Sequence, residues 1–235
     1  MDLDYAKYLL EKTRQDYNLI AEEFSNTRQF IWKDLKPLLD YTNSGDRVLD
    51  VGCGNGRLLG ALENKQIDYI GIDNSLKLID EAKKRFPRGN FQVADALNLP
   101  FPENYFDKIY SIAVLHHIPS KEFRLRVLEE IKRVLKPKGL LILTVWNLWQ
   151  RKTAWKSFFN KAFLKILGKT KLDFKDIFYP WKDKSGIIVT QRYFHLFTKR
   201  ELKKLAKKAA FKVKETGILR RPESKDNNIY LIAEK

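Results

Sequence analysis

The sequence predicts an α/β fold with a central, mostly parallel seven-stranded sheet, helices on both faces and an antiparallel edge strand. Apolar runs and amphipathic segments alternate from residue 47 to residue 146, which is the pattern of a parallel sheet. A glycine-rich turn follows the first apolar run, and acidic residues follow later ones, as at the ligand-binding edge of such sheets. Two strand-like segments near the C-terminus predict an antiparallel hairpin at one edge.

The elements follow from this alternation in chain order. Apolar positions in residues 4–41 recur at helical spacing and predict two helices, with Ser25 as a candidate cap and Pro37 bending or restarting the second. Strands are expected near 47–51, 68–72, 90–94, 106–112 and 139–146. Helices are expected near 56–64, 75–86 and 121–136. A helix near 198–209 and strands near 211–219 and 228–234 complete the fold.

Residues 150–190 break the alternation. An apolar stripe runs along residues 155–167 with lysines opposite, which suits a membrane-surface helix or, preferably, a lid or substrate arm over the sheet edge. We therefore expect a single domain, 1–235, in four parts. These are a helical cap at 1–41, a cofactor-binding half at 42–146, a basic and aromatic insertion at 147–190, and a substrate-side part at 191–235.

Composition narrows the class of protein. The chain of 235 residues is 44% hydrophobic and has no apolar run long enough to span a membrane. Its acidic, amphipathic N-terminus is unlike a signal peptide. The single cysteine, Cys53, lies in the glycine-rich turn, so a cytoplasmic setting is expected and no disulfide or metal site is predicted. A lone thiol in that turn also disfavours methylation at carbon 5 of an unmodified pyrimidine.

The formal net charge of +16 predicts an anionic partner, although lysine-rich solvated helices are an ordinary alternative. The excess lies after the first half of the chain. Residues 151–171 carry seven positive residues and no acid, and residues 199–214 carry eight against Glu201. A polyphosphate backbone is the partner that this distribution favours.

The segment RVLDVGCGNG, residues 47–56, is the most specific motif. Gly52, Gly54 and Gly56 allow a tight turn out of the first strand and a close approach to a ligand. Asp73 ends the next strand, where a carboxylate can hold the hydroxyls of a ribose. The spacing G-x-G-x-G and the nearby Asp50 suit a cationic nucleoside better than a pyrophosphate, although a degenerate dinucleotide site remains the alternative.

These residues resemble the first motif, D/E-x-G-x-G-x-G, of the class I S-adenosylmethionine-dependent methyltransferases, which have a Rossmann-like fold. The resemblance implies S-adenosylmethionine as the cofactor, with Asp50 and the three glycines at the binding loop. It places the ribose acid at Asp73, beside Asn74 in GIDNS, and the adenine-side acid at Asp95, beside Ala96 in VADALNLP. Asp50 could instead serve mainly to order the loop.

Further segments resemble the tRNA methyltransferases that esterify a 5-carboxymethyl group on the wobble uridine. The matching segments are YNLIAEEFSNTRQFIW at 17–32, VADALNLPFPENYFDKIYSIAVLHHI at 93–118, VWNLWQ at 145–150, DIFYPW at 176–181 and RYFHLF at 192–197. No [D/N/S]-P-P-[Y/F/W] motif follows the fourth strand, which disfavours methylation of a base amino group. The resemblance implies tRNA as substrate.

The chain departs from that family near its C-terminus. The family's [R/K]-D-N followed by tryptophan stands here as Lys225, Asp226 and Asn227 without the tryptophan. The demethylase and RNA-recognition domains of some animal members are absent, so a stand-alone enzyme is expected. Relatives often need a small zinc-binding activator subunit, and the sequence leaves that requirement open here.

A carboxylate acceptor has a pKa of about 4 and is already ionised at neutral pH, so it needs orientation rather than a general base. The candidate donors for that role are Arg28, His116, Arg192 and His195. The candidate walls or stacking faces are Trp146, Trp181 and Tyr193. Either His116 or the adjacent His117 could face the site, and we favour His116.

Ordinary structural roles remain open for each of these candidates. Arg28 could be a surface residue, Arg192 and His195 could be strand residues with polar ends in water, and the tryptophans could be core. At the level of function, two alternatives to the tRNA enzyme remain. One is an O-methyltransferase of a small acid or quinone-like molecule, and the other is a non-catalytic subunit that binds the cofactor and RNA.

Overall fold

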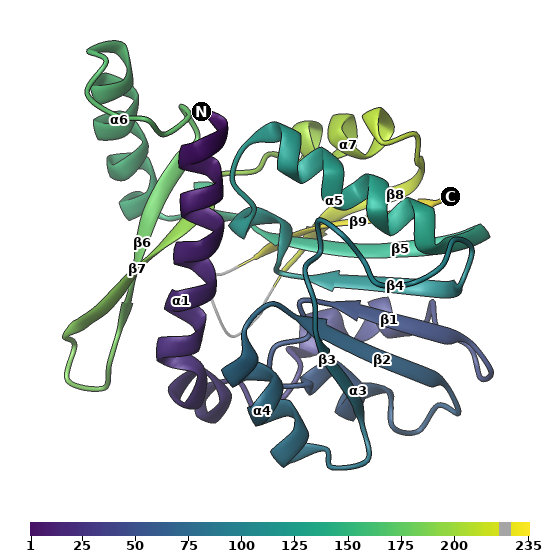
Figure 1. Ribbon diagram of the computed structural model, residues 1–235. Coiled ribbons are helices and arrows are strands. Elements are labelled where there is room, and N and C mark those ends of the chain that lie inside the picture. Colours follow the sequence, from purple (N-terminus) through teal and green to yellow (C-terminus); the bar gives the residue numbers. More distant parts are fainter. Residues whose placement is uncertain (221–226) are drawn as a thin grey trace.

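A seven-stranded sheet forms the centre of the computed structural model, which describes residues 1–220 and 227–235 apart from the side chains of Thr153, Lys161 and Ala162 (Figure 1). The strand order is β3-β2-β1-β4-β5-β9-β8, and β9 runs antiparallel to both of its neighbours while the other pairs are parallel. The strands are β1 (Arg47–Val51), β2 (Asp68–Asp73), β3 (Asn90–Val93), β4 (Phe106–Ile112), β5 (Leu135–Trp146), β8 (Lys212–Leu219) and β9 (Asn228–Glu234). The predicted fold class and C-terminal hairpin are confirmed.

Helices cover both faces of this sheet. One apolar cluster joins alternate strand residues such as Leu49 and Val51 to α5 (Lys121–Val134) and α7 (Lys199–Lys208). The other joins the opposite faces of the same strands, such as Val48, to α2 (Lys36–Leu39), α3 (Arg57–Leu62) and α4 (Leu76–Arg85). Successive residues of a strand point to opposite faces, so a strand that is covered on both faces is apolar at most of its positions.

The N-terminal region differs from its prediction. A single helix, α1 (Leu3–Thr27), is capped by the Asp2 side chain, and Ser25 lies inside its last turn instead of capping a second helix. The backbone N–H of Arg28 donates to the Ser25 carbonyl, which closes α1. The second expected helix is reduced to a 3₁₀ turn, η1 (Lys33–Leu35), and to α2, whose first turn contains Pro37. Pro37 therefore restarts the chain's helical path, as predicted.

The insertion forms a second, two-stranded antiparallel sheet that the sequence analysis did not predict. It consists of β6 (Asp176–Lys182) and β7 (Ile188–His195). Before it come η3 (Leu148–Gln150) and α6 (Lys152–Ile166), which packs against η3 and β6 and stands apart from the main sheet (Figure 1). The expectation of an arm packed over the edge of the main sheet is therefore corrected. None of the helices within the described residues has the length and apolar character needed to cross a membrane.

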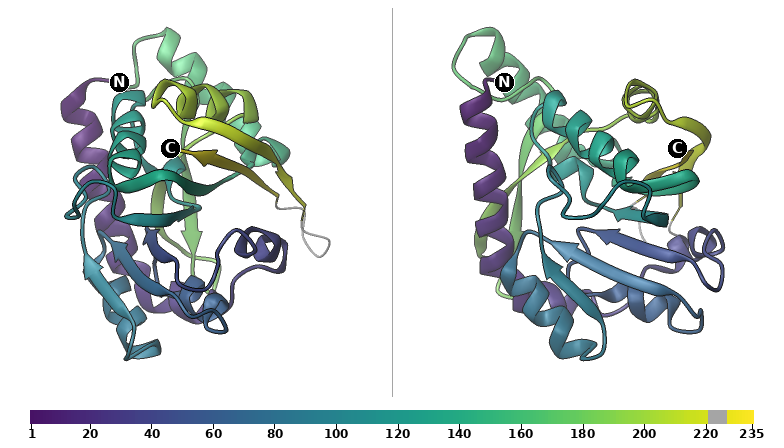
Figure 2. Two further views of the ribbon diagram at one scale, coloured as in Figure 1. Left: turned by 90° about the vertical axis from the view of Figure 1, so that its right-hand side faces the viewer. Right: turned by 45° about the vertical axis from the view of Figure 1, so that its right-hand side comes forward.

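Helix α1 connects the two sheets. It packs against α4 beside the main sheet and against β7 of the small sheet, and Figures 1 and 2 show it running between them. The carboxyl ends of β1, β2, β4 and β5 point toward α1 and the β6–β7 hairpin. A short 3₁₀ turn, η2 (Leu115–His117), follows β4 and packs against β7. Residues from both sheets and from α1 therefore meet at one place.

We predict that Ile131→Ala in α5 lowers the free energy of unfolding by about 2–5 kcal/mol, because this fully buried side chain packs against the sheet and the substitution leaves a cavity. Urea unfolding followed by circular dichroism measures the change. Glu129→Ala, on the exposed face of the same helix, is the matched control and should stay within about 0.5 kcal/mol of the parent. Equal losses for the two variants would contradict this account of the core.

Candidate functional site

A cavity lies at the carboxyl ends of β1, β2 and β4, beneath α1. Its floor is the glycine-rich turn after β1, and its far wall comes from α1 and the small sheet. The sequence-predicted residues that line it are Arg28, Asp50, Gly52, Gly54, Asp73, Asn74, Asp95, Ala96, Trp146, Trp181 and Arg192. Segments far apart in the sequence thus converge here, as the strand-end argument predicts.

The glycine-rich turn has a backbone conformation that other residues rarely adopt. The φ angles of Gly52, Gly54 and Gly56 are +74°, +56° and +77°. A Cβ atom on Gly52 would lie 2.3 Å from Val114, and one on Gly56 would lie 2.8 Å from Phe91. Gly56 precedes α3 and supports the turn from outside the cavity lining, whereas Gly52 and Gly54 face the cavity.

Two buried carboxylates border this turn. Asp73 accepts hydrogen bonds from the backbone N–H groups of Gly54 at 3.0 Å and Ser75 at 2.9 Å. Burial raises its pKa to about 6, although these hydrogen bonds oppose the shift. Asp50 accepts a hydrogen bond from the Tyr69 hydroxyl at 2.8 Å, and burial raises its pKa to about 7. Both carboxylates would be stabilised in their ionised form by a cation or a hydroxyl donor.

The residues present fit S-adenosylmethionine. Gly54 leaves open space at the loop, since a Cβ there would meet only Phe24 at 3.5 Å. Asp73 stands at the end of β2, where its oxygens can reach a ribose, and Asp95 lines the cavity after β3 with its Oδ1 on the Leu97 N–H at 2.9 Å. A set of carboxylates without a phosphate cradle suits a nucleoside that carries positive charge. Among the described residues, no cluster of His, Cys, Asp and Glu could hold a metal ion.

Arg192 on β7 forms the far wall of the cavity. It is 3% exposed, and its guanidinium carbon lies 4.8 Å from the centre of the Trp181 ring and 5.2 Å from that of Phe194. Its guanidinium donates a hydrogen bond to the Tyr17 hydroxyl at 3.2 Å, and its Nε has no partner within residues 1–220 and 227–235. No carboxylate among the described residues pairs with it. A buried cation of this kind is costly unless an anion completes its surroundings.

A chain of hydrogen bonds fixes Arg192 from behind. His117 Nδ1 lies 3.0 Å from the Tyr193 carbonyl, so it carries the proton and donates to that oxygen. His117 Nε2 is then an acceptor, and the Tyr17 hydroxyl donates to it at 2.8 Å. Burial and the charge of Arg192 lower the pKa of His117 to about 3, which keeps the ring neutral. The Tyr17 oxygen therefore turns its lone pairs toward Arg192.

A second cavity, of about 430 Å³, adjoins the first. The two share Arg28, Trp32, Trp146, Trp181 and Arg192. The second continues outward along Tyr179 and Arg151, and it ends at the amide side chains of residues 147, 150, 227 and 228. Trp181 is held by a hydrogen bond from its Nε1 to Glu23 at 2.6 Å. Flat rings, cations and amides are the groups that hold a nucleobase with its backbone.

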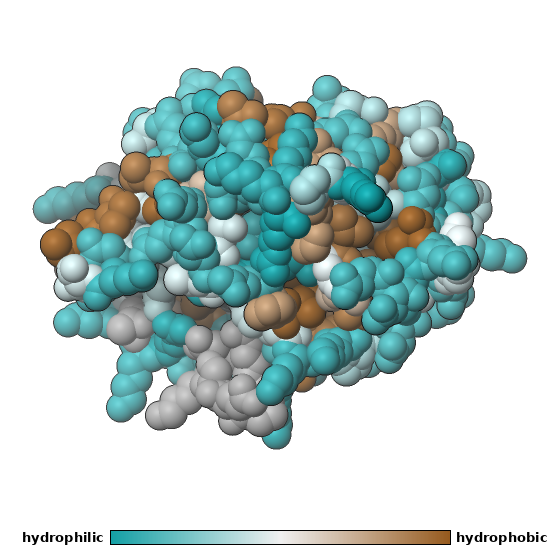
Figure 3. Space-filling view, turned by 90° about the horizontal axis from the view of Figure 1, so that it is seen from below, coloured by the Kyte–Doolittle hydropathy of each residue, from teal (hydrophilic) through white to brown (hydrophobic). Residues whose placement is uncertain are grey.

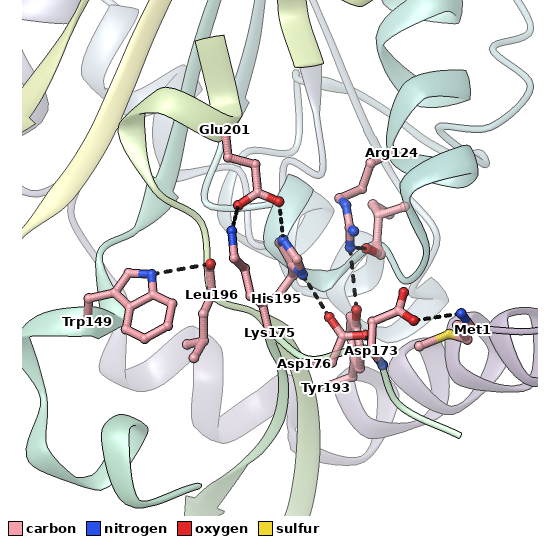
Figure 4. Close-up of polar contacts among 11 residues, drawn as sticks. Met1, Arg124, Trp149, Asp173, Lys175, Asp176, Tyr193, His195, Leu196 and Glu201 are labelled. Carbon is pink, nitrogen blue, oxygen red and sulfur yellow. Dashed lines mark hydrogen bonds and ion pairs between the residues drawn. The ribbon is translucent and has the colours of Figure 1, made fainter. Parts of the chain in front are cut away.

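His195 lies outside both cavities. Its Nδ1 is 2.7 Å from Asp176 and its Nε2 is 2.9 Å from Glu201, whose other oxygen binds Lys175 (Figure 4). Burial alone would raise the pKa of Glu201, but the contacts with His195 and Lys175 lower it to about 2. His195 thus ties the start of α7 to the small sheet.

His116 and Tyr193 also lie behind the cavity. His116 is fully buried and stacks on Phe194, with its ring centre 5.0 Å away, and burial lowers its pKa. The neighbouring His117, which we had ranked second, lines the cavity instead. Tyr193 packs against Leu9, with its hydroxyl near Arg124 (Figure 4).

Of the three C-terminal candidates at positions 225–227, only Asn227 lies within the described residues. Lys225 and Asp226 lie outside the described residues. Asn227 lines the second cavity, where its Nδ2 donates to Gln150 at 2.7 Å.

The sequence analysis missed Tyr17, Phe24 and Trp32, which line the first cavity. All three belong to the segment 17–32 that carried part of the family resemblance, so a residue-by-residue reading of that segment would have found them. Periodicity alone gives no such signal, because it assigns an aromatic residue on an amphipathic helix to the core.

The face shown in Figure 3 is mainly hydrophilic, with separate hydrophobic patches. Several cationic side chains gather between α5 and α7. Lys121, Arg200, Lys204 and Lys208 border a groove of about 580 Å³ between α5 and α7, and Glu201 is the acid among its lining residues. This arrangement favours an anionic partner.

Comparison with known proteins agrees with this geometry. A family model described as a methyltransferase domain matches residues 49–143. The "tRNA (carboxymethyluridine(34)-5-O)-methyltransferase" of Schizosaccharomyces pombe is 30% identical over the full length of both chains. The Arabidopsis thaliana protein of the same name is 41% identical over 59% of this chain, and the match spans 33% of that longer relative.

Solved structures are similar in fold. A methyltransferase from Methanosarcina mazei, described as dependent on S-adenosylmethionine, superposes with a TM-score of 0.71 at 24% identity, covering 88% of this chain and 98% of that one. A Haloferax volcanii methyltransferase in complex with the Trm112 activator superposes with a TM-score of 0.68 at 18% identity, covering 94% and 96%.

We predict that His195→Ala lowers the free energy of unfolding by roughly 3 kcal/mol, because Asp176 is fully buried and its Oδ1 would lose the His195 ring. Urea unfolding measures this loss, and calorimetry should find the affinity for S-adenosylmethionine unchanged within about twofold at a temperature where the variant is folded. Unaltered stability together with a large loss of turnover would instead place His195 in the catalytic machinery.

Proposed function

Because this chain belongs to the family of tRNA (carboxymethyluridine(34)-5-O)-methyltransferases, we propose that it methylates the carboxylate of a 5-carboxymethyl-type uridine at the wobble position of tRNA, forming a methyl ester. It is a methyltransferase that uses S-adenosylmethionine. The chain spans a third of the length of the Arabidopsis relative. We therefore propose the specific acceptor, the roles of individual residues and the partners.

The glycine-rich turn and the acids at the strand ends hold the cofactor in this proposal. Gly52 and Gly54 let the backbone approach it, Asp73 receives the ribose hydroxyls, and Asp95 lies on the adenine side. Bound S-adenosylmethionine supplies a methyl group on positively charged sulfur. Asp50, in β1 two residues before Gly52, lines the same cavity, and its ionised form adds negative charge that favours this cation.

The observation that carries the choice of acceptor is the buried Arg192 without an anionic partner in the part of the chain that the structure describes. A guanidinium presents a planar fork that matches a carboxylate with two parallel hydrogen bonds. Its unpartnered Nε belongs to that fork. An acceptor carboxylate placed there would balance the buried charge and lie at the wall facing the cofactor loop.

No general base is needed for this reaction, because the acceptor carboxylate is ionised before it binds. The chain from Tyr193 through His117 and Tyr17 cannot take up a proton at neutral pH, since His117 titrates at about 3. We assign that chain to positioning Arg192. Rings on three sides exclude water from the guanidinium, which strengthens its attraction for a carboxylate oxygen in line with the methyl group.

The second cavity receives the rest of the nucleotide. Trp146 and Trp181 offer flat faces for a base, and Arg151 and Arg28 offer cations toward its backbone. We propose that residues 147–190, together with β7, form the substrate-side arm, while residues 42–146 bind the cofactor and 1–41 covers both. Trp146 and Trp181 thus act as walls of the acceptor site.

The cationic groove between α5 and α7 provides a surface for tRNA phosphates. We place the reaction in the cytoplasm on the basis of the reduced, buried Cys53 and the tRNA substrate. A small zinc-binding activator subunit is a further proposed partner, supported by the Haloferax volcanii complex of similar fold. Its test is whether adding such a subunit raises turnover and thermal stability of the purified chain.

The proposed function is tested by mass spectrometry of nucleosides from tRNA incubated with and without the enzyme and cofactor. A base-labile methyl ester of a carboxymethyluridine should appear only with enzyme. Its affinity for tRNA should fall steeply with salt, because phosphate contacts release counterions. Ester formation on small acids or quinones, but on no carboxymethylated tRNA, would reject the proposal.

We predict that Arg192→Lys lowers kcat/KM for carboxymethylated tRNA about 100-fold or more, because a lysine keeps the charge but loses the planar fork. The affinity for S-adenosylmethionine should stay within about twofold, since Arg192 faces the acceptor. Steady-state kinetics and calorimetry measure the two quantities. Arg88→Lys, at an exposed position between α4 and β3, serves as the control. A wild-type kcat/KM for Arg192→Lys would remove the basis for the acceptor assignment.

We predict that affinity for S-adenosylmethionine weakens about tenfold between pH 7 and pH 5. Burial raises the pKa of Asp73 to about 6 in the free protein, and a ligand that needs the carboxylate must displace its proton below that pH. Affinity therefore rises with pH and levels off above the pKa. Calorimetry across this range should find proton release on binding near pH 6. Asp73→Asn should bind weakly with a flatter pH profile, and an unchanged profile in that variant would contradict the assignment.

A further inference from the structure

Asn228, the first residue of β9, is a polar side chain of the second cavity to which no individual role has yet been given. It is 2% exposed and lines the second cavity. Its Nδ2 has no hydrogen-bond partner among the residues that the structure describes. A buried amide donor without a partner is destabilising, and native structures rarely keep one without a reason.

The position of Asn228 is fixed by the main sheet. It pairs directly with Trp146 of β5 on one side and with Leu219 of β8 on the other. Residues opposite each other in an antiparallel pair project their side chains from the same face, about 5 Å apart. The Asn228 amide therefore lies beside the Trp146 ring, which lines both cavities together with Arg192.

This arrangement has the chemistry to recognise a uracil. A carboxamide offers one donor and one acceptor side by side, and the edge of uracil at N3–H and the C4 carbonyl offers the complementary pair. The C4 carbonyl neighbours C5, the ring carbon that bears the carboxymethyl group in the proposed acceptor. An amide at this edge and a guanidinium at the carboxylate would therefore hold two adjacent parts of one substrate.

We infer that Asn228 is a specificity-determining residue that binds the N3–H and C4 carbonyl edge of the acceptor uracil while the base lies against Trp146. This inference rests on the proposed function and goes beyond it, because it assigns the recognition of the base to one side chain. Arg192 then selects the carboxylate, and Asn228 selects the ring that carries it.

The test compares two substrates with two enzymes. The substrates are a synthetic anticodon stem–loop that contains 5-carboxymethyluridine and the same RNA with a methyl group on N3 of that base. The enzymes are the full-length wild type and Asn228→Ala. Asn90→Ala, an exposed position at the start of β3, is the matched control. Methyl ester formation gives kcat/KM for each pair, and calorimetry gives the affinity for S-adenosylmethionine.

N3 methylation should lower kcat/KM of the wild type about tenfold or more, since it removes one hydrogen bond and obstructs the edge. Asn228→Ala should lose a similar factor on the unmethylated RNA. It should lose less than about threefold more on the methylated RNA, because the two changes remove the same contact. Cofactor affinity should stay at the wild-type value, and Asn90→Ala should behave as wild type on both substrates.

If N3 methylation and Asn228→Ala lower kcat/KM by independent factors that multiply when combined, the inference is overturned and the proposed function stays intact. Full activity of Asn228→Ala would have the same meaning. Absence of ester from the wild type on both RNAs would overturn the inference and the proposed function together. Should Asn228→Ala fail to fold, Asn228→Leu keeps a similar side-chain volume and offers neither a donor nor an acceptor to the base. That variant is expected to lose activity on the unmethylated RNA and to be insensitive to N3 methylation; sensitivity equal to that of the wild type would overturn the inference.

Discussion

The guanidinium of Arg192 is buried among aromatic rings, and much of the surrounding structure is arranged around that charge. Trp181, Phe194 and Tyr17 keep water away from it, and within the described residues no carboxylate neutralises it. The rings offer partial compensation, because a cation is attracted to an aromatic face. The protein can therefore tolerate this buried charge, and the guanidinium still binds an anion of suitable shape strongly.

Helix α1 supports this arrangement because it packs beside the main sheet on one side and against the small sheet on the other. Its Tyr17 hydroxyl binds both Arg192 of the small sheet and His117 beside the main sheet. Asn18, one residue later, accepts hydrogen bonds from the Ser75 hydroxyl and the Lys77 N–H at the start of α4. Two adjacent residues of α1 therefore position the acceptor side and the cofactor side relative to each other.

The sequence predicts the main sheet well because its strands are buried on both faces and read as continuous apolar runs. The expected strand 106–112 and the expected strand 228–234 coincide with β4 and β9. The β6–β7 hairpin was missed because its residues alternate less clearly and its turn, closed by Asp183 through N–H groups of Ser185 and Ile187, interrupts an aromatic-rich segment. Each of these two strands is defined by its pairing with the other, and the periodicity of a single segment does not reveal that pairing.

The same limit applies to the site. Strand ends predict where Gly52, Asp73 and Asp95 meet, because topology alone brings them together. The hydrogen bond between Tyr17 and Arg192 spans 175 residues and is invisible to any local pattern. His195 was ranked with the site because it shares a segment with Arg192, yet odd and even residues of β7 face opposite ways.

The division into two sheets has a consequence for how this architecture can diversify. The donor of the methyl group would be held by loops of the large sheet, whereas Arg192 belongs to a hairpin that contributes nothing to that sheet's hydrogen-bond ladder. Replacing side chains on the hairpin could thus retarget the molecule to a neutral or cationic recipient without disturbing its nucleoside cradle. The preference for the recipient's charge can therefore evolve separately from the machinery that holds the donor, whereas recognition of the base by Asn228 stays on the large sheet.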